Sequence, residues 1–426
     1  MPECNLPYHH ETMTVRVPQA NFLGVFESKV NSFSPPLSES NLVEQALAEP
    51  IGSPRLDQLV CGKREMVLIT SDHTRPVPSA LTLPILLHHI RQANPAIQIT
   101  ILVATGFHRA TTREELLAKF GRTIVENETI IIHDSRDASQ LVNLGRLPSG
   151  GELWLNRRII ETELLIAEGF IEPHFFAGFS GGRKSVLPGV AGAESIMANH
   201  CAEFIASPHA HTGLLDGNPI HEDMLWAARQ AKLQFILNVI LNDKKEVIHA
   251  VAGDMEKAHL NGCEFLKQLC QIPRTEADIV ITSNGGYPLD QNIYQAVKGM
   301  TAAEAAGTND AVIIMIAACN DGHGGQSFYD QLAGARSPLA LLEHTATVPR
   351  NQTVPDQWEY QILARILSRH HVIMVTQHCA PETIRAMHME HCETADQALA
   401  RALQLKGENA RVAVLPDGVS VIVAGA

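Results

Sequence analysis

Residues 164–189 read LLIAEGFIEPHFFAGFSGGRKSVLPG. The run begins as an apolar stretch, which predicts a buried strand, and continues into a glycine-rich turn that also carries a histidine, an arginine and a lysine. Its second half nearly matches a phosphate-binding P-loop, but Arg183 stands where that pattern requires glycine before Lys184 and Ser185. We therefore reject nucleoside triphosphate hydrolysis. Two interpretations stay open, a nest of backbone N–H groups that binds a phosphate and an ordinary turn between strand and helix.

The same order of strand, polar turn and helix occurs on the N-terminal side of this stretch. Apolar runs at residues 66–70, 98–104 and 129–133 each predict a strand, and each ends in a polar turn. Such alternation predicts an α/β fold with a mostly parallel sheet flanked by helices. Ligands of such sheets bind beyond the carboxyl ends of the strands. The turns that follow the strands are therefore expected to line one crevice together with residues 172–189.

The pattern restarts near residue 273, after a short segment that predicts a linker. A strand at 278–282 leads to a second glycine turn and to a helix over 291–306, which Asp290 is expected to cap. Residues 411–424 predict a pair of strands. A chain of 426 residues is long enough for two domains, and we expect the active site in the cleft between them.

Composition excludes several classes of protein. The net charge of −13 argues against nucleic-acid binding, which requires a basic surface. The eight cysteines are scattered without a Cys-x-x-Cys pair, so neither a zinc ribbon nor a disulfide framework is indicated. No signal peptide and no apolar run of membrane-spanning length is recognised. The expectation is a cytoplasmic protein with no nucleic-acid or membrane partner.

Single side chains give weaker signals. His108 and His174 stand out among the 21 histidines because each lies in a turn at a strand end. His209 and His211, two residues apart in a loop, are interpreted as structural. The other candidates each have an ordinary alternative: Asp72 with Arg75 as a pair at a helix start, and Lys184 and Lys298 as surface charges.

Five ordered motifs together resemble the nickel-pincer lactate racemase family. They are SDHTRP at 71–76, GFHR at 106–109, the run at 172–189, Asn199-His200, and YQAVKG at 294–299. The resemblance covers nearly the whole chain. It implies a racemase that interconverts D- and L-lactate by hydride transfer to and from a nickel pyridinium-3,5-bisthiocarboxylic acid mononucleotide, through a bound pyruvate.

The resemblance also implies a role for each motif residue. Lys184 would hold the cofactor covalently and His200 would bind nickel. His108 and His174 would be the catalytic acid and base. Further cofactor contacts would come from Asp72, His73, Thr74, Arg75 and Gly182, and substrate contacts from Arg75, Tyr294, Gln295 and Lys298.

The family further implies a large N-terminal cofactor-binding domain, residues 1–272 with the last strands at about 408–426, and a smaller α/β domain at 273–407. The expected partners are a small 2-hydroxy acid and the proteins that make the cofactor. Two alternatives stay open, a racemase or epimerase of another 2-hydroxy acid and a non-catalytic protein that binds nickel or a nucleotide. The sequence does not predict an oligomeric state.

Overall fold

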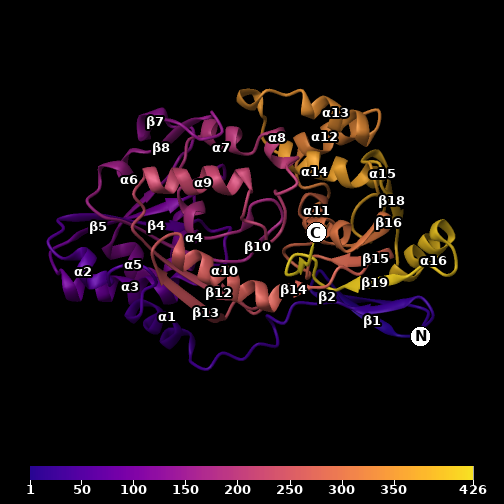
Figure 1. Cartoon of the computed structure of the whole chain (residues 1–426), viewed down its shortest axis with the longest axis horizontal. Helices are drawn as coiled ribbons and strands as arrows, with labels where there is room; N and C mark the ends of the chain where they lie inside the picture. The colour runs from indigo at the N-terminus through magenta and orange to yellow at the C-terminus, as the bar shows by residue number, and fades with distance from the viewer. Residues whose placement is uncertain (426) are drawn as a thin grey trace.

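The chain folds into two α/β lobes, each built on a six-stranded sheet (Figure 1). The computed structural model describes residues 1–425. The first sheet has the order β13-β12-β9-β4-β5-β6, and every pair is parallel except β12 with β13. Its strands are β4 (Glu65–Ser71), β5 (Gln98–Ala104), β6 (Thr129–Ile132), β9 (Leu165–Phe170), β12 (Phe235–Leu241) and β13 (Val247–Gly253).

Helices cover both faces of this sheet. Side chains alternate between the faces of a strand, so Met66 and Leu68 pack with one set of helices while Val67 and Ile69 pack with the other. Burial on both faces explains why the strands read as continuous apolar runs. The first set is α1 (Glu39–Ala48), α2 (Leu56–Val60), α3 (Ser79–Ala93), α4 (Arg113–Phe120) and α5 (Arg122–Asn127). The second is α6 (Arg157–Glu161), α7 (Ala193–Asn199), α8 (Ala202–Ile205), α9 (Pro219–Gln230) and α10 (Lys257–Cys270).

The second sheet has the order β18-β17-β16-β15-β19-β3 and is wholly parallel. Its strands are β3 (Phe22–Val25), β15 (Ala277–Ser283), β16 (Gly307–Ile316), β17 (His371–Val375), β18 (Glu390–Cys392) and β19 (Val412–Leu415). Its helices are α11 (Ile293–Ala306), α12 (Gln326–Gly334), α13 (Pro338–Ala346), α14 (Gln357–Leu367), α15 (Pro381–Ala386) and α16 (Ala395–Lys406). Within residues 1–425, no helix has the length and apolar character needed to cross a membrane.

Small two-stranded sheets and short helices complete the fold. The paired strands are β1 (Glu3–Tyr8) with β2 (Glu11–Arg16), β7 (Leu141–Arg146) with β8 (Glu152–Asn156), β10 (Pro173–His174) with β11 (Gly178–Phe179), and β14 (Gln271–Ile272) with β20 (Ile422–Val423). The 3₁₀ helices are η1 (Ala138–Gln140), η2 (Gly182–Ser185) and η3 (Arg350–Gln352).

Strand pairing corrects the expected division of the chain at both ends. The first strands and the last residues, 408–426, were assigned to the N-terminal domain, yet β3 and β19 lie side by side in the second sheet. The β1–β2 hairpin also packs on this sheet, because Leu6 and Val15 belong to the same core cluster as Ile279 (Figure 1). The last two strands do not form the expected pair, since β20 pairs with β14 in the segment taken for a linker. The boundary near residue 272 stays a prediction.

The start of α11 also differs from the expectation. Asn292, not Asp290, caps the helix, and its side-chain oxygen accepts a hydrogen bond from the Gln295 N–H at 2.9 Å. The Asp290 carboxylate instead accepts the backbone N–H groups of His9 and Ala318, at 2.6 and 3.2 Å. Asp290 therefore ties the N-terminal hairpin to the second lobe.

The position of β19 inside the second sheet predicts the effect of truncating its side chains. Leu415 is fully buried, whereas Leu405, ten residues earlier on α16, is 40% exposed. Leu415→Ala should lower the free energy of unfolding by about 2–5 kcal/mol, because it leaves a cavity in a packed core. Leu405→Ala should change it by less than about 0.5 kcal/mol. Urea unfolding of both variants measures this, and equal effects would contradict the central position of β19.

Candidate active site

A cavity of about 350 Å³ lies at the carboxyl ends of β4, β5 and β9 and receives side chains from both lobes. Nine residues expected at the site line it: Asp72, Arg75, His108, His174, Lys184, His200, Tyr294, Gln295 and Lys298. The convergence follows from topology, because parallel strands bring the turns after them to one edge of the sheet. The second lobe contributes to the opposite wall through α11 and α14.

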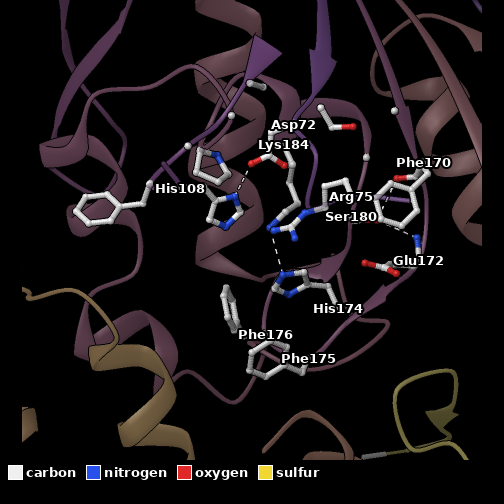
Figure 2. A pocket seen from close by; sticks show the side chains of 18 of the residues that line it. Asp72, Arg75, His108, Phe170, Glu172, His174, Phe175, Phe176, Ser180 and Lys184 are labelled. Carbon is white, nitrogen blue, oxygen red and sulfur yellow. Dashed lines mark hydrogen bonds and ion pairs between the residues drawn. The ribbon is translucent and has the colours of Figure 1, made fainter. Parts of the chain in front are cut away.

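Asp72 and His108 form a hydrogen-bonded pair on the first-lobe wall (Figure 2). Asp72 follows β4 and is 1% exposed, and its Oδ2 lies 2.7 Å from His108 Nδ1. Burial alone would raise the pKa of Asp72, but the hydrogen bonds from His108 and Thr74 outweigh it and the pKa falls. An ionised Asp72 holds the hydrogen of His108 on Nδ1, so that Nε2 keeps its lone pair.

Three predicted cofactor residues do not line the cavity. Thr74 stays close to it, because its hydroxyl donates to Asp72 at 2.7 Å. His73 points instead towards the start of α4, where Nδ1 lies 3.2 Å from the Thr111 hydroxyl and Nε2 lies 3.5 Å from Glu115. Gly182 turns its N–H to the Asn238 side chain at 2.8 Å, so this N–H is already occupied.

A buried arginine, Arg183, stabilises the glycine-rich turn at residues 177–182. Arg183 is 1% exposed, and its guanidinium donates to the carbonyls of Ala177 and Gly181 at 2.9 and 3.3 Å. Burial lowers its pKa to about 10, so it remains charged at neutral pH. Arg183, the residue that breaks the P-loop pattern, therefore lies outside the cavity lining and stabilises the turn through hydrogen bonds. Gly182 has φ +52°, and a Cβ there would lie 2.8 Å from the His259 ring, which explains the glycine.

Lys184 and His174 meet inside the cavity, and both are expected to be uncharged. Lys184 Nζ lies 3.5 Å from His174 Nε2 and 5.9 Å from the centre of the Phe176 ring (Figure 2). Burial, reinforced by nearby cations such as Arg75, holds the pKa of Lys184 well below its ordinary value. Burial likewise lowers the pKa of His174, and the nearby cations Lys298 and Arg75 lower it further. A neutral amine is a nucleophile and a neutral imidazole is a base.

His200 ends α7 and presents one ring nitrogen. Its Nδ1 lies 2.9 Å from the Ile196 carbonyl, so Nδ1 carries the hydrogen and Nε2 is left as a donor of electrons. Burial lowers the pKa of His200 to about 3, which keeps the ring neutral. The ring packs edge-on against Phe176 and Trp358. A neutral ring whose Nδ1–H is held by a backbone carbonyl has its Nε2 lone pair available for a ligand.

On the second-lobe wall, Lys298 Nζ donates to Gln295 Oε1 at 2.7 Å. Tyr294 is fixed beside them, because its hydroxyl donates to Asp356 at 3.2 Å. These three polar residues share one face of α11, and all three line the cavity. The apolar residues of the same helix are buried: Ile293, Ala296, Val297 and Met300.

Four residues of the cavity wall received no role of their own in the sequence analysis: Glu172, Phe176, Trp358 and Glu359. The first two lie inside the glycine-rich run, so their position was the available signal. Trp358 and Glu359 begin α14, whose sequence carries no motif that we recognised. Trp358 is half-buried and Glu359 is buried. Their position in the cavity wall becomes apparent only when the second lobe is packed against the first.

Comparison with known proteins agrees with this geometry. Family models described as the lactate racemase N-terminal domain and the lactate racemase C-terminal domain match residues 8–213 and 272–423. The chain belongs to the lactate racemase family. This confirms the resemblance found in the motifs, and it places the chain among isomerases.

Relatives and solved structures support the assignment over the whole length. The chain is 53% identical over 419 residues to a lactate racemase of Lactiplantibacillus plantarum, covering 98% of this chain and 99% of the relative. It is 51% identical over 423 residues to a lactate racemase of Thermoanaerobacterium thermosaccharolyticum, covering 99% of each. The solved apoprotein of a lactate racemase from that organism superposes with a TM-score of 0.96, at 50% identity, over 99% of this chain and 100% of that one.

A second solved structure shows the fold alone. It is a protein from Thermotoga maritima with a TM-score of 0.64 at 19% identity, and it covers 92% of this chain and 99% of that chain. The mixed α/β architecture with two lobes is therefore confirmed by close and distant relatives.

The neutral state of Lys184 can be tested without a bound ligand. In the protein without cofactor, acetic anhydride near pH 7 should acylate Lys184 faster than exposed Lys244, because an exposed lysine is almost wholly protonated at this pH. Peptide mass spectrometry over a time course measures both rates, and Lys184→Arg identifies the peptide. Labelling of Lys184 no faster than Lys244 would contradict an uncharged amine.

Proposed function

We propose that this chain interconverts D- and L-lactate. The observation that carries the proposal is the pair of histidines, His108 and His174, in one cavity that also holds Arg75, Gln295 and Lys298. A racemase acts on one carbon from two sides, so it needs two groups that exchange the hydroxyl proton. A 2-hydroxy acid also needs cations for its carboxylate. The family relation and the cavity chemistry support the same reaction.

The residues present fit the nickel-pincer mononucleotide. Within residues 1–425, no group of three or more His, Cys, Asp or Glu side chains is arranged to hold a metal ion. A nickel ion bound by His200 would thus take its other ligands from a bound group, and neutral imidazole suits nickel. The Lys184 amine would hold that group through a thioamide. When bound, the cofactor supplies the acceptor and donor of the hydride that leaves and rejoins the α-carbon.

The chain's own residues bind the substrate and move its proton. His108 is set up as a base, because Asp72 holds its Nδ1 hydrogen and stabilises the imidazolium that forms at Nε2. Burial keeps His174 neutral, so it can accept the proton from the other enantiomer. Arg75 would grip the carboxylate with its planar guanidinium, and Lys298 with Gln295 would hold it from the second lobe. Loss of the hydroxyl proton and the α-hydrogen leaves pyruvate bound between the lobes.

The proposal also covers how the protein acquires its cofactor and where in the cell it acts. The proteins that make the cofactor would be transient partners, and the expected setting is cytoplasmic. Once loaded, Lys184 should no longer react with acetic anhydride, and its peptide should carry the mass of the cofactor arm. Another 2-hydroxy acid is the alternative substrate, which assays over a panel of such acids would identify.

The two histidines give the direct test. Loaded wild-type protein supplied with one enantiomer of lactate should form the other, as chiral chromatography measures. His108→Ala and His174→Ala should each slow this by about 10²–10⁴-fold, the usual contribution of a general acid or base. His89→Ala, at a site paired with Glu44 and outside the cavity, should keep the wild-type rate. An unchanged rate in either cavity variant would contradict the two-base scheme, and no product from the wild type would contradict the function.

A further inference from the structure

Two residues of the motifs at the strand ends, His73 and Arg109, have no part in the proposed reaction, and neither lines the cavity. His73 lies in the segment that follows β4, residues 72–77, which we call the β4 turn. Arg109 lies in the segment that follows β5, residues 105–110, which we call the β5 turn. Both side chains reach the carboxylate of Glu115, in the first turn of α4. One acidic residue therefore joins the two turns.

The contact of Glu115 with the β5 turn is a bidentate ion pair. The Arg109 guanidinium donates to Glu115 Oε2 at 2.9 Å and to Oε1 at 2.5 Å. Oε2 also accepts the Thr112 backbone N–H at 2.8 Å, which completes the capping box of α4. The hydrogen bonds from Arg109 and Thr112 lower the pKa of Glu115 to about 2, so the carboxylate is ionised at neutral pH. Paired hydrogen bonds between charged groups fix direction as well as distance.

The β4 turn is bound to the same helix. His73 Nδ1 lies 3.2 Å from the hydroxyl of Thr111, and its Nε2 faces Glu115 Oε1 at 3.5 Å. One helical turn further along α4, the Lys119 ammonium donates to the backbone carbonyl of Arg75 at 2.8 Å. α4 therefore supports the β4 turn and the β5 turn together.

The relative position of the two turns sets the geometry of Asp72 and His108. Asp72 belongs to the β4 turn and His108 to the β5 turn, so their 2.7 Å hydrogen bond joins the turns on the cavity side. Glu115 joins them on the outer side, through Arg109 and His73. A shift of one turn against the other would lengthen the inner hydrogen bond and move His108 Nε2 from its place in the cavity.

We propose that Glu115 is a positioning residue for racemisation, which holds the β4 and β5 turns in register so that Asp72 orients His108 towards the substrate hydroxyl. The inference rests on the proposed function and adds a residue outside the cavity. Glu115 touches neither the substrate nor the cofactor in this scheme. It acts through Arg109 and His73 on the position of His108.

Capping of α4 alone makes a different prediction for the variant Glu115→Gln. Glutamine serves in a capping box as glutamate does, so the variant keeps one carbonyl oxygen for the Thr112 N–H. It replaces the other oxygen by an NH₂ group, which cannot accept from Arg109. An ion pair with an exposed partner contributes little to stability, so the variant should stay folded. A defect in Glu115→Gln therefore reports the link between the turns.

Two further variants complete the design. Glu114→Gln is the matched control: Glu114 is exposed in the same turn of α4, and within residues 1–425 its side chain makes no hydrogen bond or ion pair. Arg109→Gln removes the partner and should reproduce Glu115→Gln. The double variant Arg109→Gln/Glu115→Gln should lose little more than either single variant, because all three lack the same interaction.

The first readout is hydrogen–deuterium exchange, by mass spectrometry, of the protein without cofactor. The backbone N–H of His108 donates to the Thr105 carbonyl at 2.9 Å, so the β5 turn contains a protected amide. Peptides over this turn should exchange about 2- to 5-fold faster in Glu115→Gln, as expected from losing an exposed ion pair. Glu114→Gln should match wild type. Exchange at the wild-type rate in Glu115→Gln, or an equal increase in Glu114→Gln, would overturn the proposal.

The second readout is the kinetics of the loaded enzyme in both directions. In Glu115→Gln, kcat should fall by about 10-fold, because a displacement of about 1 Å at a catalytic group can cost about 10²-fold. The KM for lactate should change less, because Arg75 keeps its hydrogen bond to Lys119. An unchanged kcat, or additive losses in the double variant, would overturn the proposal. If wild-type protein fails to racemise lactate, the proposed function fails, while the exchange rates still decide whether Glu115 holds the turns.

Discussion

The buried guanidinium of Arg183 is the interaction on which the cavity depends. Its guanidinium donates hydrogen bonds to backbone carbonyls in the turn that follows β9. These bonds fix the path of the segment that runs from His174 to Lys184. A charge at 1% exposure is costly unless its donors are used. Here backbone carbonyls and the His259 ring accept from the two terminal nitrogens, while Nε has no partner among the described residues. These hydrogen bonds stabilise the turn. Two reactive side chains are thereby held 3.5 Å apart.

The cavity that results contains more potential cations than it can keep charged. Arg75, Lys184, Lys298 and three histidines line one small cavity. Burial and mutual repulsion make Lys184, His174 and His200 neutral, which is the state needed for a nucleophile, a base and a metal ligand. Burial and the charge of Arg75 also lower the pKa of Lys298, which together with Arg75 is proposed to bind the substrate carboxylate.

Much of this could be predicted from the sequence. Buried strands and the turns after them are local patterns, so the parallel α/β class and the convergence of Asp72, His108 and Lys184 could be predicted. Contacts between distant segments left no local trace. The pairing of β19 with β3 joins residues almost four hundred positions apart, so β19 was placed in the wrong lobe. Asp290 looked like a helix cap because the hairpin that it binds is equally remote.

The central claim is that the α-hydrogen leaves as hydride to a bound acceptor while histidines carry only the hydroxyl proton. Racemisation of lactate deuterated at the α-carbon, in ordinary water, tests this directly. A hydride held on a bound acceptor does not exchange with solvent, so the account predicts that both enantiomers recovered at equilibrium keep their deuterium. Mass spectrometry of the separated enantiomers measures the label. Loss of deuterium to water at the rate of racemisation would show that His108 or His174 removes the α-hydrogen as a proton, and would contradict the account.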